Sequence, residues 1–512
     1  MYRTRYILVL FLGFCFSQED DFNMDATYVA TFGSVTMNNK IYNQISFTPE
    51  IPIGKNMGLG LEFYLYFDEN GELYGENWDF SSSEASFKTI VDKIKYFRYG
   101  QPFDNLYFRI GSIPSATMGF GILAKGYSNN IDYPQSRRVG FDFRYSFSDF
   151  RLEFIHSDFK EFSSPSLFGF RTVIPLANKL SLGITAATDL DQINGLVDTD
   201  NDDFPDYVDY DPNNDNIWSA YQDSIAIVEE LFNCPNSDEC QESDVQAILD
   251  QLEEAFNNEQ LQNDFLENDN ISGLGIDLAY QINDRWTVYT ELAQLIGETV
   301  NPYDESISPE LYADFDTNLG FGFIPFGMIG RLGPNYEVTF GMDIRQSSEK
   351  FVFHYWDQNY DHNRAMISGD KYITKESQLY NYGKLKGLNI SLLAQIKFFL
   401  FGTHYMYMVG DRWDSEVDDY VESKNNSFYM KFGIDTSMIP KVRVAELFYQ
   451  QLNTPNPFDF KKDENTLFGL NIGIDVADNM ALIFKARETY IKNDNGKYEA
   501  VRSTQIETSV YF

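Results

Sequence analysis

The chain is poor in cysteine, histidine and tryptophan, and it lacks long apolar runs beyond its first residues. Its 512 residues include only 3 Cys, 4 His and 5 Trp. No later stretch offers the roughly 20 consecutive apolar residues that a transmembrane helix needs. Basic residues are also scarce, with 39 Lys and Arg against 77 Asp and Glu. The net charge of −38 excludes a nucleic-acid-binding surface, which requires a basic face.

Aromatic residues are abundant instead. The chain holds 45 Phe and 34 Tyr, and its mean hydropathy is −0.35. Many aromatics without long apolar runs are typical of a membrane β-barrel, whose strands alternate and whose interfaces carry aromatic girdles. A large soluble β-protein is the alternative that composition alone leaves open.

Apolar and polar residues alternate along the chain with the period of a β-strand. Leu274, Ile276 and Leu278, for example, fall on one face, while Gly275 and Asp277 fall on the other. The same alternation recurs in residues 105–111, 138–147, 180–185, 338–345, 428–435 and 468–476. Such a continuous apolar face would leave too much apolar surface exposed on a soluble protein. The pattern predicts an all-β transmembrane antiparallel β-barrel of about 18 strands, within a range of 16–20.

The last eight residues show this pattern at the C-terminus. Ile506, Thr508, Val510 and Phe512 alternate with Gln505, Glu507, Ser509 and Tyr511. The segment resembles the last strand of bacterial outer-membrane β-barrels, whose terminal aromatic is part of the signal read by the barrel-insertion machinery. The resemblance, to the porin-like class, covers nearly the whole mature chain. It implies an outer-membrane location in a Gram-negative-type bacterium, with membrane lipid, the insertion machinery and small solutes as partners.

The N-terminus has the pattern of a cleaved signal peptide. Arg3 and Arg5 precede a short apolar run over residues 7–16, and small and polar residues follow. The run is too short to cross a bilayer as a helix. We therefore expect residues 1–18 to be removed and residues 19–512 to form the barrel.

An acidic insertion interrupts the barrel pattern at residues 191–270. It holds 23 Asp and Glu and no Lys or Arg, so it accounts for most of the net charge. Within it, residues 198–215 resemble a thrombospondin type 3 calcium repeat, whose carboxylates wrap one cation. The resemblance implies Ca²⁺ bound by Asp198, Asp200, Asp202, Asp206 and Asp209, with the Phe204 carbonyl as a sixth ligand. Asp203 stands where the sharp-turn glycine is expected, and the alternative is a solvated acidic loop.

Two helical patterns follow the calcium-repeat-like segment, over residues 217–232 and 244–265. Cys234 and Cys240 lie between them and suit a disulfide in an oxidising compartment. We expect a small helical subdomain, placed outside the cell because long barrel insertions are usually extracellular.

Strand phase also identifies charged residues that we expect to face the lumen. They are Arg109, Arg138, Asp142, Arg144, Asp277, Glu291, Asp343, Arg345, Lys431, Asp435, Asp475, Lys485 and Arg487. These residues either line a pore or pair across strands to fill the wall. The Gly-rich, apolar segment 112–126 either folds into the lumen as a constriction or forms an ordinary external loop. A short capped helix is expected at residues 82–94.

No catalytic constellation or nucleotide-binding fingerprint stands out, so we do not expect an enzyme. The leading hypothesis is a porin-like outer-membrane channel for passive diffusion of small solutes. One alternative is a surface-displayed binding or adhesion protein anchored by the barrel. The other is an outer-membrane carrier for apolar solutes of the fatty-acid type.

Overall fold

The structure is a computed structural model that describes most of the chain from Thr27 to Tyr511. Outside the described residues lie 1–26, 38–39, 76–77, 103, 132, 134–136, 149, 197–269, 300–316, 334–337, 369–370, 397, 415–416, 418, 435–438, 464, 493–496 and 512. Among the described residues, no helix is long and apolar enough to cross a membrane.

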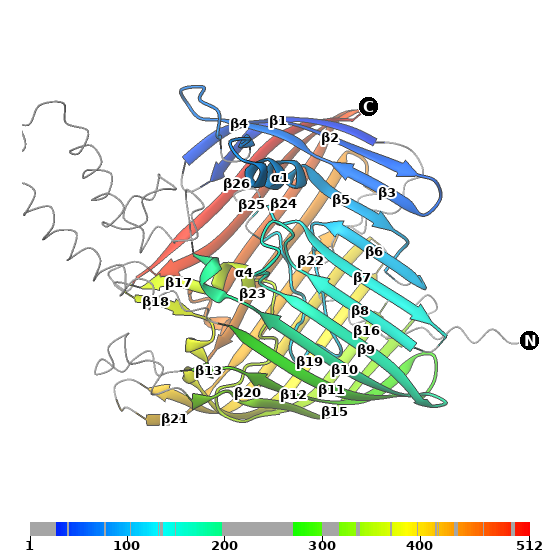
Figure 1. Ribbon diagram of the computed structural model, residues 1–512, viewed down its shortest axis with the longest axis vertical. Coiled ribbons are helices and arrows are strands. Elements are labelled where there is room, and N and C mark those ends of the chain that lie inside the picture. The colour runs from blue at the N-terminus through cyan, green and yellow to red at the C-terminus, as the bar shows by residue number, and fades with distance from the viewer. Residues whose placement is uncertain are drawn as a thin grey trace, which may run out of the picture.

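One large antiparallel sheet dominates the described part of the chain and closes on itself (Figure 1). Its strands are β1 (Thr27–Met37), β2 (Lys40–Ile53), β3 (Met57–Leu61), β4 (Phe63–Phe67), β5 (Ile94–Tyr99), β6 (Leu106–Gly111), β7 (Gly140–Phe147), β8 (Phe150–His156), β9 (Phe168–Ala177), β10 (Leu180–Asp189), β11 (Ile271–Gln281), β12 (Trp286–Ile296), β15 (Phe321–Leu332), β16 (Val338–Ser347), β19 (Tyr382–Ile396), β20 (Phe399–Asp414), β21 (Asp419–Lys424), β22 (Asn426–Ile434), β23 (Val442–Thr454), β24 (Thr466–Ala477), β25 (Met480–Lys492) and β26 (Tyr498–Tyr511).

The sheet closes because β1 pairs with β26 along a register that runs from Val29 opposite Tyr511 to Val35 opposite Gln505. β3 and β4 both pair with β2, and β21 and β22 both pair with β20. β3 and β4 therefore occupy one strand position of the barrel, and β21 and β22 occupy another. The 22 described strands of the sheet thus make a closed barrel of 20 strands.

The remaining shorter elements are not part of this wall. They are the pairs β13 (Glu298–Thr299) with β14 (Thr317–Asn318) and β17 (Ala365–Ser368) with β18 (Lys371–Thr374), the helices α1 (Ser83–Asp92) and α4 (Tyr360–Asn363), and the 3₁₀ turns η2 (Gln192–Gly195), η4 (Ser377–Asn381) and η6 (Pro457–Asp459). α1 confirms the predicted helix, and its N-cap residue Ser82 accepts a hydrogen bond from the N–H of Ala85.

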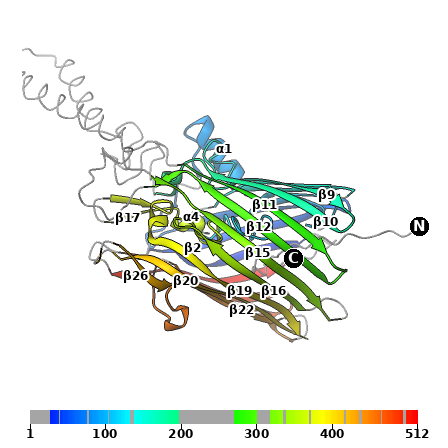
Figure 2. The same cartoon turned by 90° about the horizontal axis from the view of Figure 1, so that it is seen from below.

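The two ends of the barrel differ in the length of their connections. At the end where β1 begins and β26 stops, the connections are short turns, such as residues 178–179 and 478–479. At the other end they include residues 68–93, 112–139 and 348–381. Figure 2 shows the β9–β10 turn at one end and α4 with β17 at the other. β10 ends and β11 begins at the long-loop end, so the acidic insertion joins the barrel there.

The outer surface of the wall is apolar. On β11, Leu274 and Ile276 point outward and are 52% and 47% exposed. Asp277, the next residue along the strand, points inward and is 3% exposed. On β26, Ile506 is exposed, while Gln505 and Glu507 are buried on the inner side. The alternation seen in the sequence therefore sets which face of each strand points outward.

The closed antiparallel sheet confirms the predicted all-β antiparallel barrel. The best value of 18 strands was too low, because 20 strands surround the barrel, at the upper limit of the predicted range. The alternation is interrupted by Pro49 and Pro52 in β2 and by glycines and Glu62 around β3 and β4. Proline and charged residues weaken a period-two pattern, so strands of this kind are hard to count from sequence. Residues 1–18, and the insertion between 197 and 269, lie outside the described residues.

Candidate functional site

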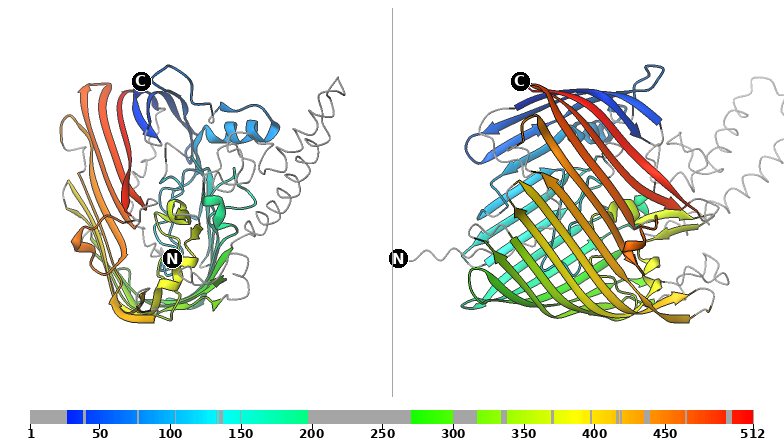
Figure 3. Two further views of the ribbon diagram at one scale, coloured as in Figure 1. Left: turned by 90° about the vertical axis from the view of Figure 1, so that its left-hand side faces the viewer. Right: turned by 180° about the vertical axis from the view of Figure 1, so that it is seen from behind.

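Two long loops fold back into the barrel instead of projecting from it. The first inner loop comprises residues 112–139 and the second comprises residues 348–381; together we call them the plug. Their buried residues, including Ile122, Leu123 and Trp356, form one hydrophobic cluster with inward residues of the wall such as Tyr289. Figure 3 (left) shows both loops inside the ring of strands. Of the two expectations for segment 112–126, the structure agrees with folding into the lumen.

The two inner loops are joined to each other by backbone hydrogen bonds. Ala124 forms a parallel β-bridge with Trp356. The N–H of Lys125 donates to the Trp356 carbonyl at 3.0 Å, and the N–H of Trp356 donates to the Leu123 carbonyl at 3.1 Å. This pairing satisfies polar backbone groups that would otherwise be buried without partners. The plug is therefore a single packed unit rather than two independent loops.

Glu291 on β12 attaches the first inner loop to the wall. Its carboxylate accepts hydrogen bonds from the N–H groups of Phe120 at 3.1 Å and Ile122 at 3.2 Å. The Phe120 ring stacks on Tyr289 with the ring centroids 3.8 Å apart. Gly119 has a φ of +64°, and a Cβ there would lie 2.5 Å from the carboxylate. Only glycine fits this approach without displacing Glu291.

A polar network beneath the plug connects the wall to both loops. Arg345 on β16 donates to Asp343 and contacts the Nε2 of His354 in the second inner loop at 2.8 Å. Lys125 of the first inner loop lies 3.5 Å from the Nε2 of His404 on β20. Asp343 also accepts from the Tyr289 hydroxyl at 3.1 Å. Buried charges are thus paired or hydrogen-bonded, as a low-dielectric interior requires.

Burial changes the protonation of the loop residues in this network. Desolvation, followed by repulsion from Arg345, lowers the pKa of Lys125 to about 7. Desolvation also lowers the pKa of His354 well below its usual value, and Arg345, Lys125 and His404 add to this effect. His354 is therefore neutral and can accept a hydrogen bond from Arg345.

The base of the acidic insertion is attached to the second inner loop. Gln192, in η2, is fully buried; its Oε1 accepts from the Tyr355 hydroxyl at 2.7 Å, and its Nε2 donates to Glu376 at 3.2 Å. Arg364 forms an ion pair with Asp189 at 3.4 Å. The segment that leads into the insertion therefore packs against the plug.

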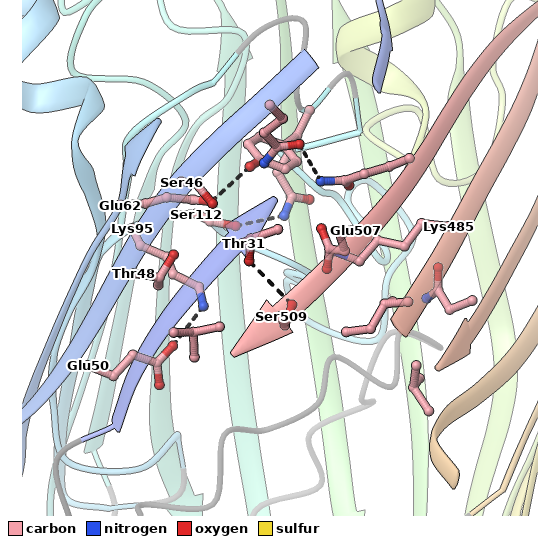
Figure 4. A pocket seen from close by; sticks show the side chains of 18 of the residues that line it. Thr31, Ser46, Thr48, Glu50, Glu62, Lys95, Ser112, Lys485, Glu507 and Ser509 are labelled. Carbon is pink, nitrogen blue, oxygen red and sulfur yellow. Dashed lines mark hydrogen bonds and ion pairs between the residues drawn. The ribbon is translucent and has the colours of Figure 1, made fainter. Parts of the chain in front are cut away.

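A polar cavity remains in the part of the barrel that the plug does not fill. It has a volume of about 530 Å³ and lies against β1, β2 and β23 to β26, with β5 and β6 on its other side. Figure 4 shows Thr31, Ser46 and Thr48 from one wall and Lys485, Glu507 and Ser509 from the adjoining one. Most of the residues that line it carry a hydroxyl, amide or charged group, and the carbon atoms of their side chains also form part of its surface.

The carboxylates of the cavity lining are paired with cations. Glu50 pairs with Lys95 at 2.7 Å and Glu507 pairs with Lys485 at 3.0 Å. Glu62 pairs with Arg137, and Glu446 pairs with Lys431 at 3.3 Å. Arg443 and Arg138 pair in turn with Asp475 at 2.8 Å and Asp361 at 3.4 Å, which lie beyond the lining.

The charged residues that strand phase predicts to face the lumen fall into three groups in the structure. Arg109, Arg138 and Lys485 line the cavity, and Lys431 and Asp475 pair with residues that line it. Asp277, Glu291, Asp343 and Arg345 are buried beneath the plug, where Asp277 pairs with Arg171. Asp142 pairs with Arg144 at 3.0 Å, and Arg487 lies over the Phe448 ring.

Other predicted site residues fall outside the described residues. They are Asp435, the proposed calcium ligands Asp198, Asp200, Asp202, Phe204, Asp206 and Asp209, and the cysteines Cys234 and Cys240. Within the described part of the chain, no group of three or more His, Cys, Asp or Glu is arranged to hold a metal ion.

Sequence reasoning did not single out several residues of the cavity. Glu50, Glu62 and Lys95 lie on or beside β2, β4 and β5, which are not among the segments predicted as strands from their alternation. A usable signal exists in β2, where Gln44, Ser46 and Thr48 alternate with outward apolar residues. The plug has no comparable signal, because its contacts join distant segments, as the bridge between Ala124 and Trp356 does.

Comparisons with known proteins find structural similarity only at low sequence identity and low TM-score. No protein-family model and no curated protein matches the chain. Among solved structures, Pseudomonas aeruginosa OccK11 (OpdR) is 8% identical with a TM-score of 0.31, covering 95% of this chain and 94% of its own. Acinetobacter baumannii OccAB4 is 8% identical, with a TM-score of 0.32 and coverage of 95% and 97%.

A third structural match is Wzi from Escherichia coli, described as an outer-membrane protein involved in group 1 capsule assembly and a carbohydrate-binding β-barrel. It is 11% identical, with a TM-score of 0.31, covering 96% of this chain and 85% of its own. Scores this low carry no conclusion about function, which has to be argued from the site.

Proposed function

We propose that the protein is a porin-like outer-membrane channel through which small hydrophilic solutes diffuse passively along the cavity beside the plug. The observation that carries this proposal is a polar cavity of about 530 Å³ inside a closed barrel whose outer surface is apolar. A wall of this kind requires lipid around it, and a polar interior offers water and solutes a path. No chemical step is part of the proposal.

The orientation follows from the asymmetry of the two ends. Outer-membrane barrels have short periplasmic turns and long extracellular loops. We therefore place the short turns, with Thr27 and Tyr511, on the periplasmic side. The plug and the acidic insertion then belong to the extracellular side.

A second function has specific support. The base of the insertion packs on the plug through Gln192 and Tyr355, and the plug fills much of the lumen. This arrangement favours a surface-displayed binding protein for which the barrel serves as an anchor. The polar lining of the cavity argues against the third candidate, a carrier for apolar solutes.

Solute flux into liposomes distinguishes these functions. The full chain, reconstituted in lipid vesicles, should admit uncharged sugars up to a size limit. Deletion of residues 198–268 should leave that flux unchanged, because this deletion retains η2 and its contacts with the plug. Vesicles that exclude even the smallest sugar while the barrel is inserted would contradict the channel and favour the anchor.

A further inference from the structure

The charges of the cavity lining do not balance. Among the described residues, the lining includes six cationic side chains but only four carboxylates. All four carboxylates are paired with a lysine or arginine, as described above. The cavity is thus more positive than the strongly acidic chain as a whole would suggest.

Arg109 on β6 is the cation responsible for the difference. Each of the other five lining cations has a carboxylate partner: Lys95 with Glu50, Arg137 with Glu62, Arg138 with Asp361, Arg443 with Asp475 and Lys485 with Glu507. Arg109 has none among the described residues. Its Nε donates to the Ser112 carbonyl at 2.7 Å, and its guanidinium lies over the Tyr96 ring, 4.8 Å from the centroid.

Neighbouring residues do not neutralise Arg109. Across the sheet it is opposite Arg98 on β5 and Asp142 on β7. Arg144 engages both oxygens of Asp142, at 3.1 and 3.0 Å. The backbone carbonyl and the ring hold the guanidinium in place while leaving its charge uncompensated.

We propose that Arg109 makes the cavity selective for small anions over cations. This inference rests on the proposed channel function. A fixed, uncompensated positive charge attracts anions and repels cations that pass nearby, and water-filled pores select by such charges. The carboxylates of the lining are all paired with cations, so they contribute little negative charge to offset that of Arg109.

The test is the reversal potential of the full chain in a planar bilayer of neutral lipid under a potassium chloride gradient. The unsubstituted channel should favour chloride. Arg109→Gln should lower the chloride-to-potassium permeability ratio by about twofold or more, as Coulomb's law gives for a unit charge ~8 Å from an ion in water. Arg109→Lys should retain the preference.

Two further variants exclude indirect effects. Ser112→Asp places a carboxylate beside Arg109 without removing the guanidinium, so it should lower the ratio as Arg109→Gln does. Arg502→Gln removes the same charge from β26, where the side chain is 64% exposed and pairs with Glu488. It should leave the ratio unchanged.

The possible failures are distinguishable. A conducting channel that favours potassium overturns this inference and leaves the proposed channel intact. So does a chloride-to-potassium permeability ratio that neither Arg109→Gln nor Ser112→Asp changes from that of the unsubstituted channel. An inserted barrel that does not conduct overturns the channel, and the selectivity with it.

Discussion

Single buried side chains attach the plug to the wall of the barrel. Glu291, Arg345 and Lys125 are charged residues whose partners lie on other elements, so each one connects the wall to a loop. Their strand phase could be predicted, since Asp277, Glu291, Asp343 and Arg345 do point inward. That they hold a plug instead of facing water could not be predicted, because the partner groups are backbone and side-chain atoms of distant loops.

Replacing Glu291 with Ala should loosen the first inner loop. The N–H groups of Phe120 and Ile122 would lose their acceptor, at a cost of about 1–3 kcal/mol for each buried group left unsatisfied. Hydrogen exchange at these two amides should become faster. The control Glu422→Ala removes an exposed carboxylate from β21 and should have no such effect. Unchanged exchange in Glu291→Ala would show that Glu291 does not hold the loop.

Lys125 should make docking of the plug depend on pH. Burial lowers its pKa to about 7 from 10.5, so between these values the released loop binds more protons than the docked loop. Docking should therefore become more favourable as the pH rises through this window, and it should be constant below it. Lys125→Met should abolish the dependence.

Protection factors of the backbone amides of residues 112–131, corrected for the intrinsic exchange rate, measure this effect. They should rise from pH 7 to pH 10 in the unsubstituted chain and stay level in Lys125→Met. The same rise in both proteins would refute the assignment to Lys125.

At the scale of elements, the strands and the loops differ in how far the sequence determines them. The strands follow from period-two alternation, which is a local property, and each segment named from this alternation overlaps a described strand. The inner loops depend on contacts such as the Ala124–Trp356 bridge, which joins segments that lie far apart in the sequence. An apolar, Gly-rich stretch at 112–126 indicated an unusual loop but not its packing partner.

Trp356 should be the main packing residue between the inner loops. It is fully buried, and its indole N–H donates to the Ser166 carbonyl at 3.2 Å. Trp356→Ala should destabilise the plug by about 3–5 kcal/mol, the usual cost of deleting a buried aromatic side chain. The wall should stay intact, and channel current should rise or become noisy as the plug detaches.

The control for this variant is Trp286→Ala, which alters a tryptophan at the short-turn end of β12, away from the plug. Its current should match that of the unsubstituted channel. If Trp356→Ala leaves the current and the exchange of both loops unchanged, the plug does not depend on this contact.

The calcium site in the insertion remains a prediction from sequence. Chelation of Ca²⁺ should increase protease cleavage between residues 190 and 270, because the carboxylates would repel one another without the cation. Asp200→Asn together with Asp202→Asn should give the same cleavage without chelator. Identical cleavage with and without chelator would exclude a structural calcium ion.

At the scale of the whole molecule, the apolar outer wall, the plug and the polar cavity are the basis of the proposed channel, whose path would lie to one side of the lumen. The closed barrel could be predicted because closure requires only strands of sufficient number and one continuous apolar face. The position of the path could not be predicted from the sequence, because it depends on how far the two inner loops fill the lumen. Ser509 lies on the proposed path, where its hydroxyl is 3.3 Å from that of Thr31.

The most direct test is thiol labelling of a cysteine placed on this path while single-channel current is recorded. A hydrophilic thiol reagent should block the current of Ser509→Cys. The current of Thr508→Cys, on the outer face of β26, and that of the unsubstituted chain should persist. Steady current that the reagent leaves unchanged in Ser509→Cys would show that solutes do not pass beside the plug, and would contradict the account.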